Sequence, residues 1–248
     1  MIGLAVILGL VVGSFLNVVI ARLPAHRSLW RPGSACPTCG AAIAWHDNIP
    51  LLSFLLLRGR CRACGAPISW RYPLVEFLTG GLFGLAWLVF GATRDALIAI
   101  ALLATLIAIT FIDLRHQIIP DVITLPGVVA GLLANLTTGR VPWVESVLGI
   151  VAGGGAFLVI ILASGGGMGG GDMKLGAMLG AFLGWKVTLL SLFLAVVLGG
   201  ILAIALLASG RSGRKDPIPF GPFLAVGGTV GLFWGERLVA WYLSGFAG

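Results

Sequence analysis

The sequence has 248 residues, of which 58% are hydrophobic and 10% are charged, and its formal net charge is +7 at pH 7. Soluble domains carry about a quarter charged residues, so the composition excludes an ordinary soluble enzyme and favours a membrane protein. We find no basic soluble module for nucleic-acid binding, and the excess of basic residues instead indicates orientation in a membrane.

Apolar runs predict an all-α polytopic membrane protein with about eight transmembrane helices. The expected spans are residues 2–21, 74–91, 96–112, 122–136, 144–163, 173–185, 187–208 and 220–243. Most runs approach the ~20 residues with which a helix crosses a bilayer, and helices satisfy the backbone groups that lipid cannot. Pro126 interrupts the fourth run, and the sixth run is short. The first run lacks a preceding basic residue and a following cleavage pattern, so we expect a retained helix rather than a signal peptide.

The only sizeable hydrophilic insertion spans residues 22–73. It divides the chain into a first transmembrane helix at 1–21, a loop at 22–73 and a transmembrane helical core at 74–248. With the N-terminus outside, twelve of the sixteen basic residues fall on the inner side, which places this loop in the cytoplasm. These twelve are Arg22, Arg27, Arg31, Arg58, Arg60, Arg62, Arg71, Arg115, Lys174, Arg211, Arg214 and Lys215.

All four cysteines lie in this loop, as two C-x-x-C-G motifs. The motifs are Cys36-Pro37-Thr38-Cys39-Gly40 and Cys61-Arg62-Ala63-Cys64-Gly65. Paired motifs of this kind are typical of a four-thiolate zinc site. Two disulfides or four idle thiols are the alternatives; a reducing cytoplasm disfavours the first, and the matched spacing disfavours the second. We therefore predict a zinc-ribbon-like loop, in which Zn²⁺ is structural because four protein ligands leave no open position.

Two aspartates stand at the inner ends of predicted spans. Asp113 ends the third span, and Asp172 follows the glycine-rich run 165–171 and opens the sixth. Ionisable groups at membrane depth are costly, so they suggest function. Two carboxylates held close together share a proton, and such a pair can activate water and polarise a peptide carbonyl. The alternatives are that Asp172 caps its helix and that Asp113 pairs with an arginine; the residues alone leave both open.

Several other residues carry weaker expectations. Asp121 is expected to cap the fourth span, and Asp47 is expected to be solvated in the loop. Glu76 is a candidate either for a substrate contact or for an ion pair with an arginine. The glycine pairs Gly80-Gly81, Gly199-Gly200 and Gly227-Gly228 are expected at helix contacts. The histidines show no metal-ligand spacing, and the glycine run lacks the ending of a phosphate loop.

The motifs along the chain resemble the type IV prepilin peptidases, which are membrane aspartic proteases with a G-x-G-D motif. The matching segments are residues 13–20 (Gly-Ser-Phe-Leu-Asn-Val-Val-Ile), Arg22-Leu23-Pro24, both cysteine motifs, Arg71-Tyr72-Pro73 through Glu76, Asp113-Leu114, Ile119-Pro120-Asp121, Gly169-Gly170-Gly171-Asp172-Met173-Lys174 and Ile218-Pro219-Phe220-Gly221-Pro222. The resemblance runs over nearly the whole chain, and the order of these segments makes it specific.

This resemblance implies a protease of the bacterial cytoplasmic (inner) membrane that cuts pilin and pseudopilin precursors after a glycine, at the cytoplasmic face. The catalytic aspartates of the family fall on Asp113 and Asp172. Many members also methylate the new N-terminus with S-adenosylmethionine, and those members generally carry the cysteine loop. Glu76, Asp121 and Lys174 are candidate substrate contacts, and the basic loop is expected to meet membrane lipids.

Two other functions compete with proteolysis. An ion or proton transporter would also place carboxylates within the membrane, but it would need neither the cysteine loop nor the glycine run. A non-catalytic assembly factor of the cell envelope could use the loop as a docking surface.

Overall fold

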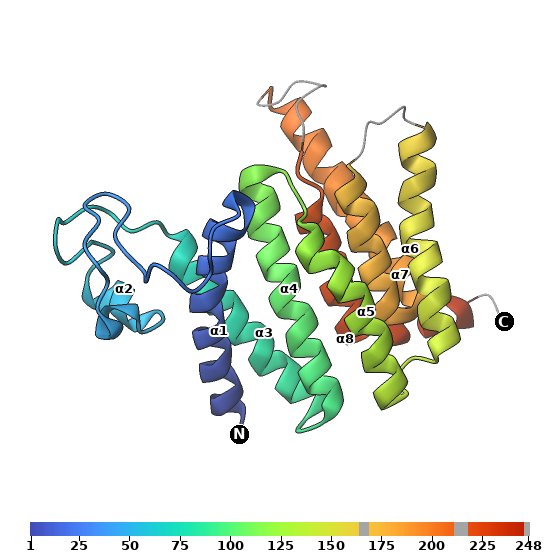
Figure 1. The fold of residues 1–248 in the computed structure, drawn as a ribbon. Coiled ribbons are helices and arrows are strands. Elements are labelled where there is room, and N and C mark those ends of the chain that lie inside the picture. The colour runs from blue at the N-terminus through green and yellow to red at the C-terminus, as the bar shows by residue number, and fades with distance from the viewer. Residues whose placement is uncertain (164–168, 211–217, 246–248) are drawn as a thin grey trace. The chain divides into compact units, whose positions relative to one another are not determined.

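The computed structural model describes residues 1–163, 169–210 and 218–245 (Figure 1). The elements are α1 (Ile2–Arg22), η1 (Leu23–Ala25), η2 (Trp45–Asn48), α2 (Leu52–Leu56), α3 (Arg71–Phe90), α4 (Arg94–His116), α5 (Asp121–Thr138), α6 (Trp143–Ala163), α7 (Gly170–Ala208) and α8 (Gly221–Ser244). The chain forms two compact units, Met1–Ala108 and Ile109–Gly248, which we describe separately.

Seven helices within the described residues are long and apolar enough to cross a membrane: α1, α3, α4, α5, α6, α7 and α8. The all-α, multi-pass class predicted from the sequence is therefore confirmed. Pro126 lies inside α5 without ending it, because membrane helices tolerate proline where neighbouring groups satisfy the freed backbone. The count differs from the expected eight because two apolar runs, 173–185 and 187–208, fall in the single element α7.

Helix α7 folds back on itself at Gly184. A straight helix of its 39 residues would be about 58 Å long, nearly twice the hydrocarbon thickness of a bilayer. Gly184 has φ 73° and ψ 166°, a conformation open to glycine, and it separates a first arm (170–183) from a second arm (185–208). A Cβ atom on Gly153 of α6 would meet both Gly176 and Thr188, one residue from each arm. The two ends of α7 accordingly lie at the same end of the unit (Figure 1).

Small residues set the helix contacts in both units. In the first unit α1 packs on α3. A Cβ on Gly9 would lie 2.7 Å from the Cα of Gly80, and a Cβ on Gly13 would lie 2.7 Å from the Cα of Glu76. In the second unit α6 packs on α7, and a Cβ on Gly176 would lie 2.8 Å from the carbonyl oxygen of Gly153. Gly9 and Gly13 are four residues apart in α1, and small residues at this spacing let membrane helices approach closely.

The predicted glycine pairs contribute unequally to these contacts. Both members of Gly227-Gly228 face α7, where Ser191 and Leu179 leave no room for a Cβ. In the other two pairs, only Gly80 and Gly199 are crowded, and a Cβ on Gly81 or Gly200 would meet nothing within 4 Å.

Asn135 holds the turn of α7 from inside the second unit. This side chain is 2% exposed, and its Nδ2 donates to the carbonyl oxygens of Ala181 and Phe182 and to Oγ of Ser146, over 2.9, 3.2 and 2.9 Å. Carbonyl groups at the end of a helix lack partners in the next turn. Asn135 supplies these partners immediately before the chain reverses at Gly184.

Candidate active site and metal site

Asp113 binds the N-terminal end of α8. The side chain is buried near the end of α4, and the backbone N–H of Gly221 donates to its Oδ2 over 2.8 Å. Gly221 is the first residue of α8, so the carboxylate satisfies one of the free N–H groups of that helix. Among the ion pairs of the described residues, none includes Asp113, so the arginine partner considered from the sequence is not found there.

Asp172 is buried in the first turn of α7. Its carboxylate accepts a hydrogen bond from the backbone N–H of Gly169, which caps the helix, and it lies within electrostatic range of Asp113. Gly169 holds the N-cap position and Asp172 is the third residue of α7, so the N-cap role weighed for Asp172 is not found; its hydrogen bond with Gly169 is half of a capping box instead. The proximity of Asp172 to Asp113 shows that the two predicted aspartates, from α7 and α4, interact electrostatically within the second unit.

Gly170 and Gly171, which precede Asp172, differ in how closely other residues approach them. A Cβ on Gly171 would lie 2.9 Å from Cβ of Ile119, whereas a Cβ on Gly170 would meet nothing within 4 Å. Gly171 therefore allows the start of α7 to pack against the segment between α4 and α5. Residues 165–168 of the same run lie outside the described residues.

Asp121 and Lys174 form an ion pair between α5 and α7. The Nζ of Lys174 lies 2.7 and 2.6 Å from the two carboxylate oxygens of Asp121. Asp121 is the first residue of α5, whose cap position is taken by Pro120. The capping role expected for Asp121 was therefore wrong, because its side chain turns to the lysine of α7 instead.

Glu76 belongs to the first unit and holds the four-cysteine loop. It is buried, its Oε2 accepts the backbone N–H of Leu51 over 2.8 Å, and it accepts a hydrogen bond from the side chain of Ser14. The described ion pairs do not include Glu76, so the arginine pair, one of the two alternatives weighed for it, is not found among them. Its contacts tie the loop to α1 and α3.

The four cysteine sulfurs form a cluster suited to a metal ion. All four Sγ atoms lie within 4.8 Å of one another, and those of Cys36 and Cys64 are 3.9 Å apart. A tetrahedral zinc site with Zn–S bonds of about 2.3 Å separates its sulfurs by about 3.8 Å. The cluster thus fits a four-thiolate metal site, and within the described residues it is the one group with that geometry.

The two cysteine motifs adopt the same turn. Gly40 and Gly65 both have φ 72°, and their N–H groups donate to Cys36 and Cys61 over 2.9 Å in each case. The backbone N–H groups of Cys39 and then Thr38 lower the pKa of Cys36 to about 6, whereas for Cys64 the backbone N–H of Ala66 acts against the neighbouring thiols, which raise the pKa of Cys64 to about 11. The positive φ of each glycine permits the tight backbone turn that both motifs make.

Asp47 is not solvated as expected. Its side chain is 10% exposed, and Arg62 donates to both carboxylate oxygens over 2.8 and 2.6 Å. These hydrogen bonds from Arg62 hold the pKa of Asp47 below its usual range. The pair fastens the second cysteine motif to η2.

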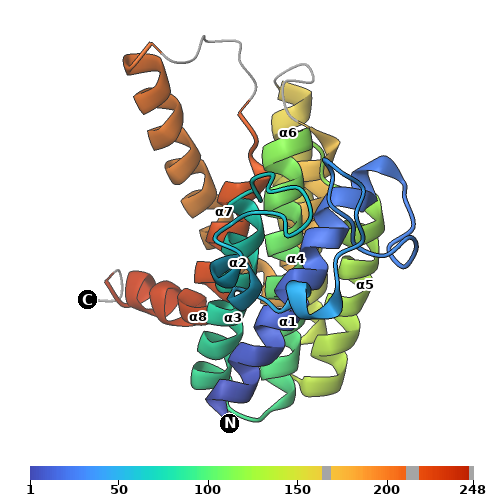
Figure 2. The same cartoon turned by 90° about the vertical axis from the view of Figure 1, so that its left-hand side faces the viewer.

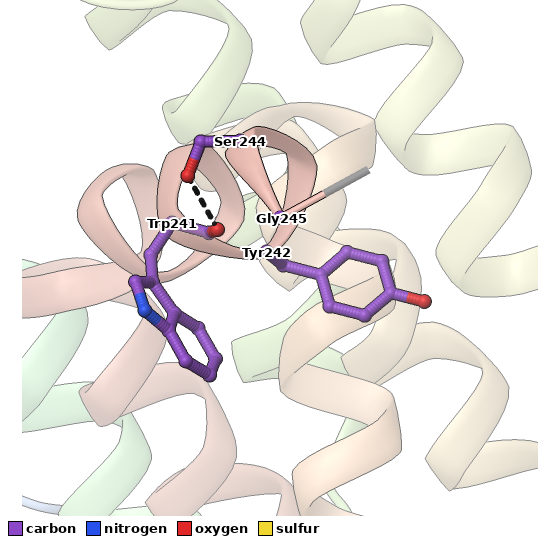
Figure 3. A pocket seen from close by; sticks show the side chains of 4 residues that line it. All are labelled: Trp241, Tyr242, Ser244 and Gly245. Carbon is purple, nitrogen blue, oxygen red and sulfur yellow. Dashed lines mark hydrogen bonds between the residues drawn. The ribbon is translucent and has the colours of Figure 1, made fainter. Parts of the chain in front are cut away.

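A shallow hollow lies at the C-terminal end of α8, lined by Trp241, Tyr242, Ser244 and Gly245 (Figure 3). Ser244 Oγ donates to the carbonyl oxygen of Trp241 over 2.8 Å. Twenty residues of helix place Trp241 about 30 Å from Gly221. The hollow is therefore at the opposite end of α8 from the aspartates, where exposed aromatic rings suit a membrane interface.

Gly221 is the site residue that the sequence did not single out. It stands in the segment Ile218–Pro222, but no role was assigned to it there. Proline in the first turn is a signal for a helix start, and Pro222 marks the beginning of α8. That signal locates the free N–H groups, but it does not show that Asp113 meets one of them.

Comparison with known proteins assigns the chain to a family. Residues 7–90 match the model described as bacterial peptidase A24 N-terminal domain, and residues 100–204 match the type IV leader peptidase family. A prepilin leader peptidase/N-methyltransferase of Aeromonas hydrophila is 41% identical over 98% of this chain and 94% of its own length. The chain belongs to the type IV leader peptidase family. The resemblance drawn from the motifs is thereby confirmed.

Further relatives carry the same description. A prepilin leader peptidase/N-methyltransferase of Pseudomonas aeruginosa is 40% identical over 98% of this chain and 93% of its own length. One of Myxococcus xanthus is 46% identical over 84% of this chain and 64% of its own length. No solved structure matches the chain.

Proposed function

We propose that this protein cleaves the basic leader from type IV prepilin and pseudopilin precursors, after a glycine, at the cytoplasmic face of a bacterial inner membrane. The observation that carries the proposal is the placement of Asp113 and Asp172 within electrostatic range of each other in the second unit. Membership of the leader peptidase family supports the choice of reaction. In this proposal residues 1–21 form the first transmembrane helix, 22–73 the cytoplasmic loop and 74–248 the catalytic core.

In hydrolysis, one carboxylate would act as a general base and the other as a general acid. Close carboxylates share one proton, and the protons belong to the pair rather than to either residue. The ionised member takes a proton from water as its oxygen attacks the peptide carbonyl carbon, while the protonated member donates to the carbonyl oxygen. The C–N bond then breaks as the leaving amine takes the proton that the first carboxylate removed from water, and the hydroxyl formed on the carbonyl oxygen returns its proton to the second carboxylate. Gly221 engages Oδ2 of Asp113 and so holds that carboxylate in a fixed orientation.

The precursor would approach through the bilayer. A basic leader followed by an apolar helix places the scissile bond at the inner membrane boundary, next to the carboxylates. Asp121 and Lys174 flank this position, and their ion pair supplies both an acceptor and a donor for substrate groups. Glu76 is the weaker candidate for a substrate contact, because its carboxylate already accepts hydrogen bonds from Leu51 and Ser14.

We further propose that the metal at Cys36, Cys39, Cys61 and Cys64 is Zn²⁺. The sulfur separations support this choice. A four-thiolate zinc has no open position, so it would fold the loop rather than act on substrate. The loop needs such a centre because it contributes few residues to an apolar core.

The relatives' description suggests that the new N-terminal amine is also methylated, with S-adenosylmethionine as the methyl donor. That compound supplies an electrophilic methyl group, which the amine nitrogen takes with loss of a proton. The hollow beside Trp241 lies at the far end of α8 and does not fit a donor that must meet an amine made at the carboxylates. We therefore assign no residues to the methyl donor.

A cleavage assay with purified protein tests the proposed function. A pilin precursor is incubated with the protein in detergent, and the product is identified by mass spectrometry. The proposal expects a cut after the leader glycine, with a methylated product when S-adenosylmethionine is added. An intact precursor, together with ion flux into proteoliposomes that contain the protein, would favour the transporter.

A further inference from the structure

Helix α2 exposes apolar side chains and buries its polar one, which is the opposite of a helix that faces water. Its serine, Ser53, is 6% exposed, whereas Leu55 and Leu56 are 69% and 73% exposed. Ser53 is held inward because its Oγ donates to the carbonyl oxygen of His46 over 2.8 Å and accepts the N–H of Ile49 over 3.1 Å. A soluble surface helix turns its apolar side chains inward, so the outer face of α2 suits an apolar medium.

Aromatic rings extend this apolar face. The ring of Phe54 lies 4.9 Å from that of Trp70, which caps α3 and is 75% exposed. Tryptophan is enriched at the interface between membrane and water, where one part of the ring is apolar and the N–H is polar. The exposed leucines and Trp70 thus form one surface rather than scattered side chains.

Contacts within the first unit place α2 at membrane depth. Leu51, the residue before α2, donates its N–H to Glu76. Glu76 lies five residues beyond Arg71, where the membrane helix α3 begins, so the contact is about 7.5 Å along α3. Interfacial helices bury their apolar faces about 5–10 Å into the boundary between headgroups and acyl chains. Figures 1 and 2 both draw α2 beside the first turns of α3.

The charges next to α2 complement an anionic surface. Arg58 and Arg60 follow the helix and are exposed, and α2 itself contains no acidic residue. The nearby acid Asp47 is already paired with Arg62. Exposed arginines beside an apolar face favour anionic lipid headgroups.

We propose that α2, with Trp70, Arg58 and Arg60, is an interfacial element that inserts into the membrane leaflet on the side of the four-cysteine loop and binds anionic phospholipid. Glu76 fixes the depth of this element through Leu51. The element therefore anchors the loop to the bilayer at a second point, besides α1 and α3. This role is independent of the cleavage reaction.

Photo-crosslinking in nanodiscs tests the proposal. The full-length protein carries p-benzoylphenylalanine in place of Leu55, or of Leu56 as a second site, in nanodiscs with equal phosphatidylcholine and phosphatidylglycerol. We expect phospholipid adducts at either position by intact-protein mass spectrometry. The same group in place of Ala42, an exposed residue two positions after the first cysteine motif, should give few adducts.

The lipid preference tests the role of the arginines. Phosphatidylglycerol adducts should exceed phosphatidylcholine adducts by up to about thirtyfold, since each of the two arginines near the membrane surface contributes a factor of about five. Arg58→Gln with Arg60→Gln should remove this preference, whereas Arg27→Gln with Arg31→Gln should keep it. Adducts with a second chain or an added precursor peptide, in place of lipid, would overturn the proposal. Equal lipid adducts at Ala42, or an unchanged preference in the Arg58/Arg60 variant, would overturn it too.

Discussion

Gly221 donates its backbone N–H to Oδ2 of Asp113 over 2.8 Å. The two residues are 108 positions apart in the chain, and their contact joins the end of α4 to the start of α8. A Cβ on residue 221 would lie 2.8 Å from that same Oδ2. The approach therefore depends on the absence of a side chain at this position.

Gly221→Ala should reduce precursor cleavage by about tenfold or more, because the added methyl group displaces the Asp113 carboxylate and a small displacement of a catalytic group is costly. The measurement is kcat/KM for cleavage of a pilin precursor in detergent. Gly155→Ala is the matched control, since a Cβ there would meet nothing within 4 Å. Equal activity in Gly221→Ala and wild type would show that the contact does not orient Asp113.

Gly171→Ala and Gly170→Ala form a second matched pair. We expect Gly171→Ala to lose about tenfold in kcat/KM or more, because its methyl group would press on Ile119 and shift the turn that carries Asp172. Gly170→Ala should stay close to wild type, since its methyl group meets open space. A folded Gly170→Ala protein that does not cleave would instead indicate that substrate passes over Gly170.

Asn135→Leu should lower the free energy of unfolding by about 1–3 kcal/mol, because it leaves buried acceptors at Ala181, Phe182 and Ser146 without their donor. Denaturant unfolding in detergent micelles measures this change. Asn48→Leu, at an exposed position in the loop, is the control. Wild-type stability in Asn135→Leu would mean that the turn at Gly184 is held by other contacts.

The purified protein should contain about one zinc per chain, because a single four-thiolate site is formed. Cys39→Ser should lose this zinc and expose residues 36–65 to faster amide exchange, while Thr38→Ala in the same turn should retain it. Metal analysis and hydrogen-exchange mass spectrometry give the two readouts. A Cys39→Ser protein with full zinc content would contradict the four-cysteine assignment.

The sequence predicts the membrane class and the metal cluster well because both depend on local patterns. Apolar runs locate membrane helices without knowledge of their partners, and paired C-x-x-C-G motifs bring four sulfurs together through their own turns. The fold-back of α7 could also be anticipated in part, since the two runs 173–185 and 187–208 were separate. What the runs do not show is that Gly184 is the residue that reverses the chain.

Contacts between distant segments were the part that could not be read from the sequence. Glu76 was a candidate for a substrate contact or an arginine pair, and Asp121 was expected to cap a helix. Their partners in the structure are Leu51 and Lys174. These partners are set by how helices pack, and many arrangements satisfy the same hydropathy pattern. The contact of Gly221 with Asp113 escaped prediction for the same reason.

Replacement of the two aspartates tests the central claim most directly. Asp113→Asn and Asp172→Asn proteins are purified beside wild type, and cleavage of a pilin precursor is followed by mass spectrometry, with zinc content as the check on folding. We predict that each variant keeps its zinc and loses about 10³-fold in cleavage rate, the scale of a lost general acid or base. Equal cleavage by all three proteins would contradict the account and make the aspartates structural.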